Sequence, residues 1–336
     1  MRHAVITIAL FALLLAGAAT VLAQKPATMP KELAGTIEQP VGKIAFIRDN
    51  NLWVTNLDGS GQFKVVDAQN ADGPLSWAPD GKRVAFCRSG YVELKGPDHL
   101  GGKHKIYDVF IGFLDSAKTN TNWWFRLTRE LGGRYPHWMA DGSAILVTKD
   151  VNANTVNAPM PNYQTCLIDP QAESIRLIRK DWQLENGYMA IMPTPGPNNL
   201  HAYVLLNKTD RVGMAISSLD LTTLNETDIK AGKVKLLPGA TAPAWSPDGK
   251  WIAYVTTSMD DHAIYITNSD LSVKFRVYQP MMGQMLQTYP LSWSPDSKWL
   301  TFAMNDGSIW IIDITGDGLR RILGPGLQKS PTWSKK

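Results

Sequence analysis

The chain has 336 residues, of which 44% are hydrophobic and 19% are charged, and its formal net charge is +4. These values are ordinary for a globular protein, and the length fits one large all-β domain or two smaller domains. Because the net charge is small and no long run of Lys and Arg occurs, we expect no nucleic-acid partner.

The first 23 residues have the pattern of a secretory signal peptide. Arg2 and His3 form a short basic start, residues 4–15 are apolar, and residues 21–23 form a small-residue cleavage site. The alternative is a retained membrane anchor, but the apolar run is too short to span a bilayer comfortably. We therefore expect cleavage near Ala23-Gln24, a periplasmic or secreted protein, and no stable membrane insertion after cleavage.

Residues 24–40 contain three prolines and little periodicity, which predicts an exposed linker. From Val41 onward, short strand-like pieces alternate with turn residues, and no long helical period interrupts them. Alternation within each piece places one face of the strand in a core and the other face outward. Residues 41–336 are therefore predicted to form one all-β domain.

A buried Trp, a tight turn and a strand recur through this domain. The clearest copy is the run 245–254, Trp-Ser-Pro-Asp-Gly-Lys-Trp-Ile-Ala-Tyr. Pro presets the second position of a type I turn, Asp suits the third position and Gly suits the last. Related copies begin at Trp77, Trp138 and Trp293, and a copy with only its first strand begins at Trp333.

Two observations give the number of repeats. The 107-residue spacing from Trp138 to Trp245 leaves room for two repeats, and a degenerate copy lies within it at residues 192–196. The C-terminal copy supplies a first strand and residues 42–46 supply a second strand, so pairing of the two ends completes a unit and removes an open sheet edge. The sequence thus predicts a six-bladed β-propeller of about 49 residues per blade, closed by the N- and C-terminal strands.

The repeat Trp-Ser-Pro-Asp-Gly-Lys-x-Ile-Ala-Tyr/Phe resembles the WD-like propeller repeat of the TolB family, the periplasmic component of the Tol–Pal system. The resemblance is specific in four of the six repeats and extends over nearly all of residues 41–336. It implies a propeller that binds proteins in the cell envelope. TolB proteins also have an N-terminal α/β domain, and their extreme N-terminus engages TolA. Because only residues 24–40 precede the repeats here, the resemblance covers the propeller alone and does not carry TolA engagement over.

Function in a propeller concentrates in long loops held by the rigid scaffold. Loops that join second to third strands, and fourth strands to the next first strand, share the face on which the central channel opens. Long loops are predicted there at residues 88–105, 149–162, 207–211 and 256–262, whereas the turns of the Trp motif lie on the opposite face. The candidate binding residues at the channel mouth are Arg88, His104, Arg134, Tyr135, His137, Asp260, Asp261, His262, Tyr289, Asn305 and Asp306.

Asp260-Asp261-His262 is the sharpest polar cluster in these loops. It has a functional interpretation as metal ligands or a general base beside a carboxylate, and a structural one as a polar loop tip. We favour the loop tip, because adjacent residues rarely converge on one ion, and we predict neither a metal nor a cofactor. Cys87 and Cys166 lie in strand-like apolar runs of different repeats, which favours two buried thiols over a disulfide.

Two classes of function fit these observations. The sequence contains no Gly-x-Ser-x-Gly elbow and no Gly-x-x-x-x-Gly-Lys phosphate loop. The leading hypothesis is a non-catalytic protein-interaction module of the bacterial cell envelope, monomeric, with an envelope protein as its partner. The alternative is a carbohydrate- or metal-binding propeller, such as a lyase or a lactonase-like enzyme, with its site at the channel mouth.

Overall fold

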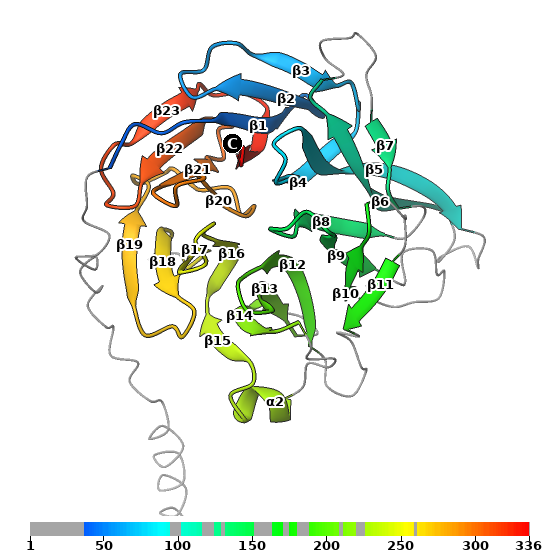
Figure 1. Cartoon of the computed structure of the whole chain (residues 1–336), viewed down its shortest axis with the longest axis vertical. Coiled ribbons are helices and arrows are strands. Elements are labelled where there is room, and N and C mark those ends of the chain that lie inside the picture. Colours follow the sequence, from blue (N-terminus) through cyan, green and yellow to red (C-terminus); the bar gives the residue numbers. More distant parts are fainter. Residues whose placement is uncertain are drawn as a thin grey trace, which may run out of the picture.

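Six four-stranded antiparallel sheets are arranged around a ring, and each sheet forms one blade (Figure 1). The computed structural model describes residues 37–94, 102–115, 124–128, 132–150, 163–170, 175–179, 188–207, 211–219, 226–258 and 261–335. The predicted six-bladed β-propeller is confirmed. None of the helices in these residues is long and apolar enough to cross a membrane.

The innermost strands of the blades surround the central axis and contact one another around the ring. Blade 1 contains, from the inside outward, β24 (Gln328–Trp333), β1 (Lys43–Arg48), β2 (Asn51–Asn56) and β3 (Phe63–Val66). Blade 2 contains β4 (Ala71–Trp77), β5 (Arg83–Leu94), β6 (Gly102–Phe113) and β7 (Trp124–Arg126). Blade 3 contains β8 (Gly133–Trp138), β9 (Ile145–Asp150), β10 (Tyr163–Ile168) and β11 (Ile175–Arg179).

The remaining three blades are also continuous in the sequence. Blade 4 contains β12 (Met189–Pro195), β13 (Leu200–Leu206), β14 (Arg211–Ser218) and β15 (Lys235–Pro238), with the short helix α2 (Glu226–Lys230) between β14 and β15. Blade 5 contains β16 (Ala240–Trp245), β17 (Trp251–Thr256), β18 (Ile264–Asn268) and β19 (Lys274–Tyr278). Blade 6 contains β20 (Ser292–Trp293), β21 (Trp299–Ala303), β22 (Ile309–Asp313) and β23 (Arg320–Leu323).

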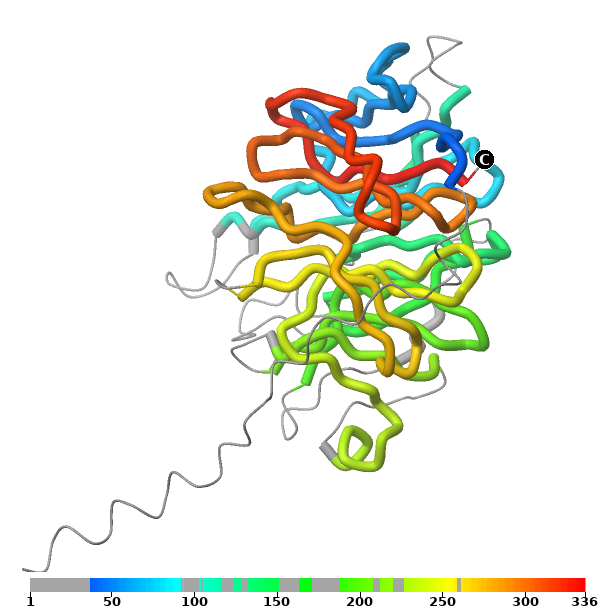
Figure 2. Tube along the Cα trace, turned by 90° about the vertical axis from the view of Figure 1, so that its left-hand side faces the viewer, coloured from blue at the N-terminus to red at the C-terminus, as the bar shows by residue number. Residues whose placement is uncertain are grey.

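Blade 1 closes the ring, because β24 from the C-terminal end pairs with β1. Ile44 lies opposite Trp333 in this antiparallel pair. At the end of the pair, the Lys43 N–H donates to the Ser334 hydroxyl and the Ser334 N–H donates to the Lys43 carbonyl, each at 2.9 Å. Figure 2 shows β1 in blue beside β24 in red. The predicted closure by the two terminal strands is confirmed.

The Trp motif forms the turn between the first and second strands of a blade. In blade 5, the Gly249 N–H donates to the Ser246 carbonyl at 2.9 Å, and Gly249 has a φ of 72°, which favours glycine. The Ser246 hydroxyl accepts from the Trp251 N–H at 3.0 Å and donates to the Asp248 carboxylate at 2.5 Å. Ser and Asp therefore hold the turn in place, and the motif marks the scaffold.

The Trp residues of the motif pack between the blades. Trp77, Trp293 and Trp333 are at most 2% exposed. The Trp77 indole N–H donates to the Thr332 carbonyl at 3.0 Å, and that of Trp293 donates to the Ala244 carbonyl at 2.9 Å. In each case the acceptor belongs to the neighbouring blade, so the indole both fills the core and bonds one innermost strand to the next.

A proline lies two or three residues before the motif position in every blade. The strand register shifts at this point in blades 1 to 5, for example between Arg134 and His137 in blade 3. Pro has no N–H to donate to a ladder, so it fits a bulge better than a regular strand. These bulges form much of the channel wall. The prolines are Pro74, Pro136, Pro193, Pro243, Pro290 and Pro331.

The prediction of a long loop at residues 88–105 was wrong for residues 88–94 and 102–105, and residues 95–101 lie outside the described residues. Strands β5 and β6 run on to Leu94 and Gly102 and pair in register, with Arg88 opposite Asp108 and Val92 opposite His104. A regular antiparallel ladder satisfies the backbone groups that a loop of this length would leave to solvent. Among the other predicted loops, residues 151–162, 208–210 and 259–260 lie outside the described residues.

Candidate functional site

The two faces of the ring carry different connections. The turn face carries the turns of the Trp motif, for example residues 78–82 and 246–250. The loop face carries the connections from an outermost strand to the next innermost strand, including residues 279–291 and 324–327. The channel therefore has two ends, and the predicted site residues distribute unequally between them.

Arg134 lies among tyrosines at the loop-face end of the channel. Its guanidinium carbon is 4.1 Å from the centroid of the Tyr107 ring and 5.1 Å from that of Tyr135. Burial lowers the pKa of Arg134, but the hydroxyls of Tyr135, Tyr163 and Tyr107 outweigh this effect and raise the pKa overall. The guanidinium thus remains charged while packed against aromatic rings.

Tyr289 joins this cluster from the far side of the ring. Its hydroxyl donates to the Asp72 carboxylate at 3.4 Å, and the Lys329 ammonium contacts the same carboxylate oxygen at 2.7 Å. Burial, followed by the negative charge of Asp72, raises the pKa of Tyr289. The charges of Arg134 and Tyr135 also act on Tyr289. The loop-face mouth is the set Asp72, Tyr107, Arg134, Tyr135, Tyr163, Tyr289 and Lys329.

The structure thus brings three predicted residues together, namely Arg134, Tyr135 and Tyr289. The other four members of the mouth were missed by sequence reasoning. All four are strand residues, and no local motif distinguishes them from ordinary strand residues. Only the ring geometry places them beside one another.

Asp261 and His262 have separate partners. The Asp261 carboxylate accepts from the Tyr265 hydroxyl at 2.9 Å, and His262 Nε2 accepts from the Leu286 N–H at 3.2 Å. Burial lowers the pKa of His262. The neighbouring Asp260 lies outside the described residues. No group of three or more His, Cys, Asp or Glu side chains suited to a metal ion occurs in the described ranges.

Asn305 and Asp306 are exposed in the turn between β21 and β22. The Asn305 N–H donates to the Met285 carbonyl at 2.8 Å, which attaches this turn to the loop 279–291. The same region carries four of the exposed apolar side chains among the described residues. These are Met281 (79% exposed), Met282 (104%), Met285 (51%) and Leu327 (74%). We call these four residues the methionine patch.

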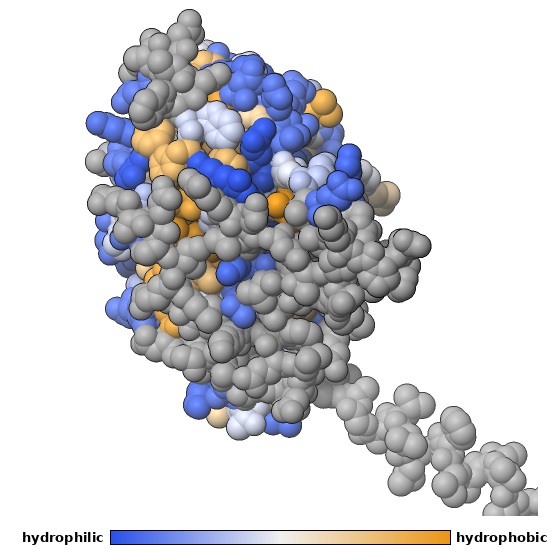
Figure 3. All heavy atoms as spheres, turned by 90° about the vertical axis from the view of Figure 1, so that its right-hand side faces the viewer, coloured by the Kyte–Doolittle hydropathy of each residue, from blue (hydrophilic) through white to orange (hydrophobic). Residues whose placement is uncertain are grey.

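Arg88 and His104 lie in the long hairpin of blade 2, apart from this mouth. The Arg88 Nε donates to the Ala68 carbonyl at 2.9 Å, and its guanidinium carbon is 5.1 Å from the ring centroid of Trp124 in the outermost strand. Arg88 and Trp124 border a groove of about 490 Å³. On this side of the molecule, hydrophobic residues are interspersed with hydrophilic ones (Figure 3). His104 pairs with Val92 in the ladder.

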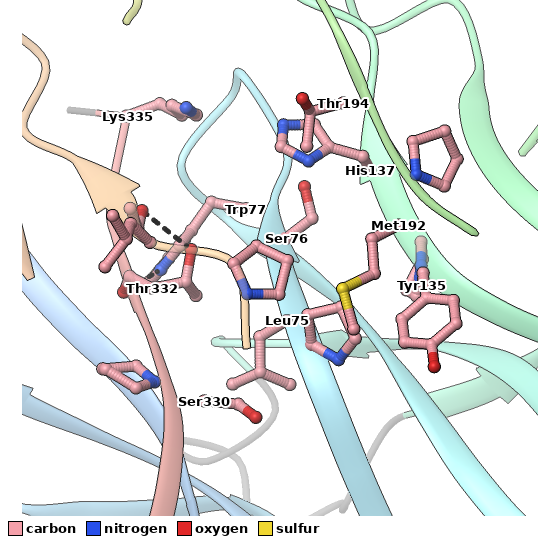
Figure 4. A pocket seen from close by; sticks show the side chains of 17 residues that line it. Leu75, Ser76, Trp77, Tyr135, His137, Met192, Thr194, Ser330, Thr332 and Lys335 are labelled. Carbon is pink, nitrogen blue, oxygen red and sulfur yellow. Dashed lines mark hydrogen bonds between the residues drawn. The ribbon is translucent and has the colours of Figure 1, made fainter. Parts of the chain in front are cut away.

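His137 lies further along the channel, toward the turn face. It lines a narrow cavity of about 30 Å³ together with Ser76, Thr194 and Lys335 (Figure 4). Such a volume holds about two water molecules. Burial, and next the positive charge of Lys335, lower the pKa of His137 to about 3. His137 is therefore neutral at physiological pH, and it also borders a wider funnel on the turn face.

Six four-stranded blades around a channel, with charged and aromatic residues at one end, define a six-bladed β-propeller. The structure is similar to TolB from Acinetobacter baumannii, with a TM-score of 0.64 and 16% identity over 90% of this chain and 69% of that chain. It is also similar to a putative TolB from Agrobacterium tumefaciens, with a TM-score of 0.55 and 14% identity over 87% of this chain and 92% of that one.

A chain from the nidogen/laminin complex has a TM-score of 0.61 and 9% identity, covering 88% of this chain and 98% of that chain. Identities this low show a shared fold and nothing finer. The resemblance to the TolB propeller is confirmed at that level. The sequence matches no protein-family model and no curated protein.

Proposed function

We propose that this chain is an exported propeller of the bacterial cell envelope that binds a protein partner through its loop face and catalyses no reaction. The observation that carries the proposal is the packing of Arg134 among Tyr107, Tyr135 and Tyr163, with Tyr289 beside them. Arg and Tyr are enriched among the residues that dominate protein–protein binding. Tyr supplies a large, rigid contact area at low cost in conformational entropy.

The methionine patch extends this surface. It is joined to the mouth through the loop 279–291, which carries Met281, Met282 and Met285 as well as Tyr289. Exposed apolar residues grouped beside polar ones are typical of interaction surfaces, and Met adapts its shape to a partner. The nidogen/laminin complex supports the proposal in one further respect, because a propeller of this fold is found there in an assembly of proteins.

The experiment is affinity capture from envelope extract with residues 24–336 as bait, followed by mass spectrometry of the captured proteins. Two variants change the loop face, Met282→Asp and Arg134→Gln. The matched control is Leu319→Asp, because Leu319 is an exposed apolar residue (40% exposed) in a turn on the other face. Thermal melting first establishes that each variant is folded.

We expect one specific partner that the wild type and Leu319→Asp retain and that both loop-face variants lose. Equal capture by all four proteins would contradict a loop-face interface, and the absence of any specific partner would contradict the proposed function. The carbohydrate-binding alternative is measured on the same proteins with a glycan array. A glycan signal that disappears in Arg134→Gln, without a captured protein, would replace the proposal.

A further inference from the structure

A funnel opens on the turn face, at the opposite end of the channel from the loop-face mouth. Its volume is about 570 Å³, which lies within the range of small-molecule sites of about 300–1,000 Å³. Trp138 and Trp245 line its walls. Trp77, His137 and Lys335 line both the funnel and the narrow cavity beneath it, so they mark the floor of the funnel.

The degenerate repeat explains why space is left here. In blade 4, Pro195 stands at the position that Trp245 occupies in blade 5, and Gly196 stands at the position of Ser246. Blade 4 therefore contributes no indole. A β-carbon on Gly196 would overlap the Trp245 ring, so glycine lets this ring pack directly against the backbone of blade 4. Pro195 and Gly196 both line the funnel.

Two indoles of the funnel differ from the other motif indoles. Trp77, Trp293 and Trp333 donate their N–H groups to backbone carbonyls at 2.8–3.0 Å. By contrast, the N–H groups of Trp138 and Trp245 are buried and have no acceptor among the described residues. Buried donors of this kind are normally satisfied, and both of these indoles line the funnel.

The floor of the funnel carries an uncompensated positive charge. Figure 4 shows the Lys335 side chain extending toward His137 and Thr194. Within the described ranges, no carboxylate pairs with Lys335. His137 is neutral, and burial lowers the pKa of Lys335 because its ammonium has lost solvent. An anion at the floor would restore the lost stabilisation.

The carboxylates of the funnel are engaged elsewhere. Asp141 accepts from the N–H and hydroxyl of Ser143 at 2.9 and 2.7 Å, and Asp248 accepts from the Ser246 hydroxyl and the Lys250 N–H. Both belong to turns of the Trp motif on the surface of the turn face. Their negative charges lie at the surface of the funnel, away from its floor. They therefore disfavour a second negative group on the outer part of a ligand.

We propose that the funnel binds a small aromatic monocarboxylate, with its carboxylate at the floor against Lys335 and its ring along Trp138 and Trp245. The cavity beneath is too narrow for more than about two waters, so the ligand ends at Lys335. This site is separate from the loop-face mouth and does not depend on the proposed protein partner.

The test uses benzoate as the probe, with benzamide as its neutral isostere and phthalate as a dicarboxylate. Binding to residues 24–336 is measured by titration calorimetry and by the fluorescence of the tryptophans. Lys335→Met removes the charge and keeps much of the length, while Lys335→Arg keeps the charge. The matched control is Lys250→Met, because Lys250 is an exposed lysine in a turn on the same face.

We expect the dissociation constant of benzoate for the wild type to be lower than that of benzamide by a factor of about ten or more. Lys335→Met should raise the dissociation constant of benzoate by a similar factor. Lys335→Arg, Lys250→Met and the loop-face variant Met282→Asp should leave benzoate binding unchanged, and phthalate should bind more weakly than benzoate. The proposal is overturned if benzoate does not bind, if benzamide binds equally well, or if Lys335→Met has no effect. If Lys335→Met is unfolded, the wild-type protein is acetylated instead, and mass spectrometry shows that Lys335 carries the acetyl group. The acetylated protein should then bind benzoate no more tightly than benzamide. A retained preference for benzoate would overturn the proposal.

Discussion

Gly73, in the innermost strand of blade 2, packs directly against Ser330, in the innermost strand of blade 1. A β-carbon on Gly73 would overlap both the hydroxyl and the β-carbon of Ser330. The contact lies where the C-terminal strand β24 meets the rest of the ring. Close approach of these two strands therefore depends on the missing side chain of one residue.

Gly73→Ala is expected to destabilise the protein by about 1–3 kcal/mol, because the added methyl group overpacks the joint between blades 1 and 2. Ser330→Gly removes both overlapping atoms, and Ser330 already has a φ of 54°, which suits glycine. The double variant should therefore be more stable than Gly73→Ala alone. Urea unfolding midpoints measure this, and an additive loss in the double variant would contradict the steric explanation.

Removal of residues 330–336 is expected to destabilise the whole ring. It deletes most of β24, including Trp333, which is fully buried and lies opposite Ile44. Burying a Trp removes about 150–250 Å² from water, which is worth about 4–6 kcal/mol at 25 cal/mol/Å² as an upper bound. Thermal melting by circular dichroism measures the loss, and removal of Lys336 alone is the control. An unchanged melting temperature would mean that the two ends do not need to meet.

The stability of the protein is expected to fall in mild acid because of His137. Its pKa is about 3 in the folded chain, against about 6.5 for an unperturbed histidine. As the pH falls below about 6.5, the unfolded chain binds a proton that the folded chain does not bind, so folding loses up to about 1.4 kcal/mol per pH unit. The stability that depends on a neutral His137 is therefore fully present above pH 6.5, and it is lost progressively as the pH falls toward 3.

His137→Gln should remove this loss of stability in acid, because glutamine does not titrate. Plots of unfolding free energy against pH for the wild type and the variant should therefore diverge between pH 6.5 and 4, with the flatter slope in the variant. Urea unfolding at a series of pH values supplies both curves. Parallel curves would show that the histidine is solvated in the folded protein.

The two cysteines are expected to be unreactive in the native protein. Cys87 and Cys166 are each 1% exposed and lie in different blades, and burial raises the pKa of Cys87 to about 12. Because the thiolate is the reactive form, a disulfide reagent should label neither residue until denaturant is added. Two thiols per chain should then react without a reductant. If no reactive thiol is detected in the denatured, unreduced protein, the two cysteines form a disulfide instead.

The fold could be predicted from the sequence because its signals are local. The Trp, the Ser-Pro-Asp-Gly turn and the following strand are contiguous, and the turn residues act through hydrogen bonds within five positions, as between Ser246 and Trp251. Even the degenerate copy at residues 192–196 was recognised from its spacing. The loop prediction fails at residues 88–94 and 102–105 because pairing of β5 with β6 satisfies that backbone, and this pairing has no local signal in the sequence.

The candidate sites were predictable only in part. Arg134, Tyr135 and Tyr289 were found because they enter innermost strands at the expected end of the channel. Tyr107 and Lys329 were missed, because their place beside Arg134 and Asp72 depends on how separate blades meet. The funnel on the turn face was missed for a related reason. Its open space comes from the missing motif Trp of blade 4. Whether the neighbouring blades fill that space depends on how they pack, which the sequence does not show.

The sequence by itself determined the number of blades and the closure of the ring, because the Trp motif recurs at a regular spacing and the two ends supply complementary strands of one blade. Tertiary structure alone decided which side chains share the two ends of the channel. Lys335 and His137 lie far apart in the sequence, and closure of the ring brings their side chains to one cavity. Ring closure is thus predictable from the repeat, but the chemistry along the channel depends on residues that differ between repeats.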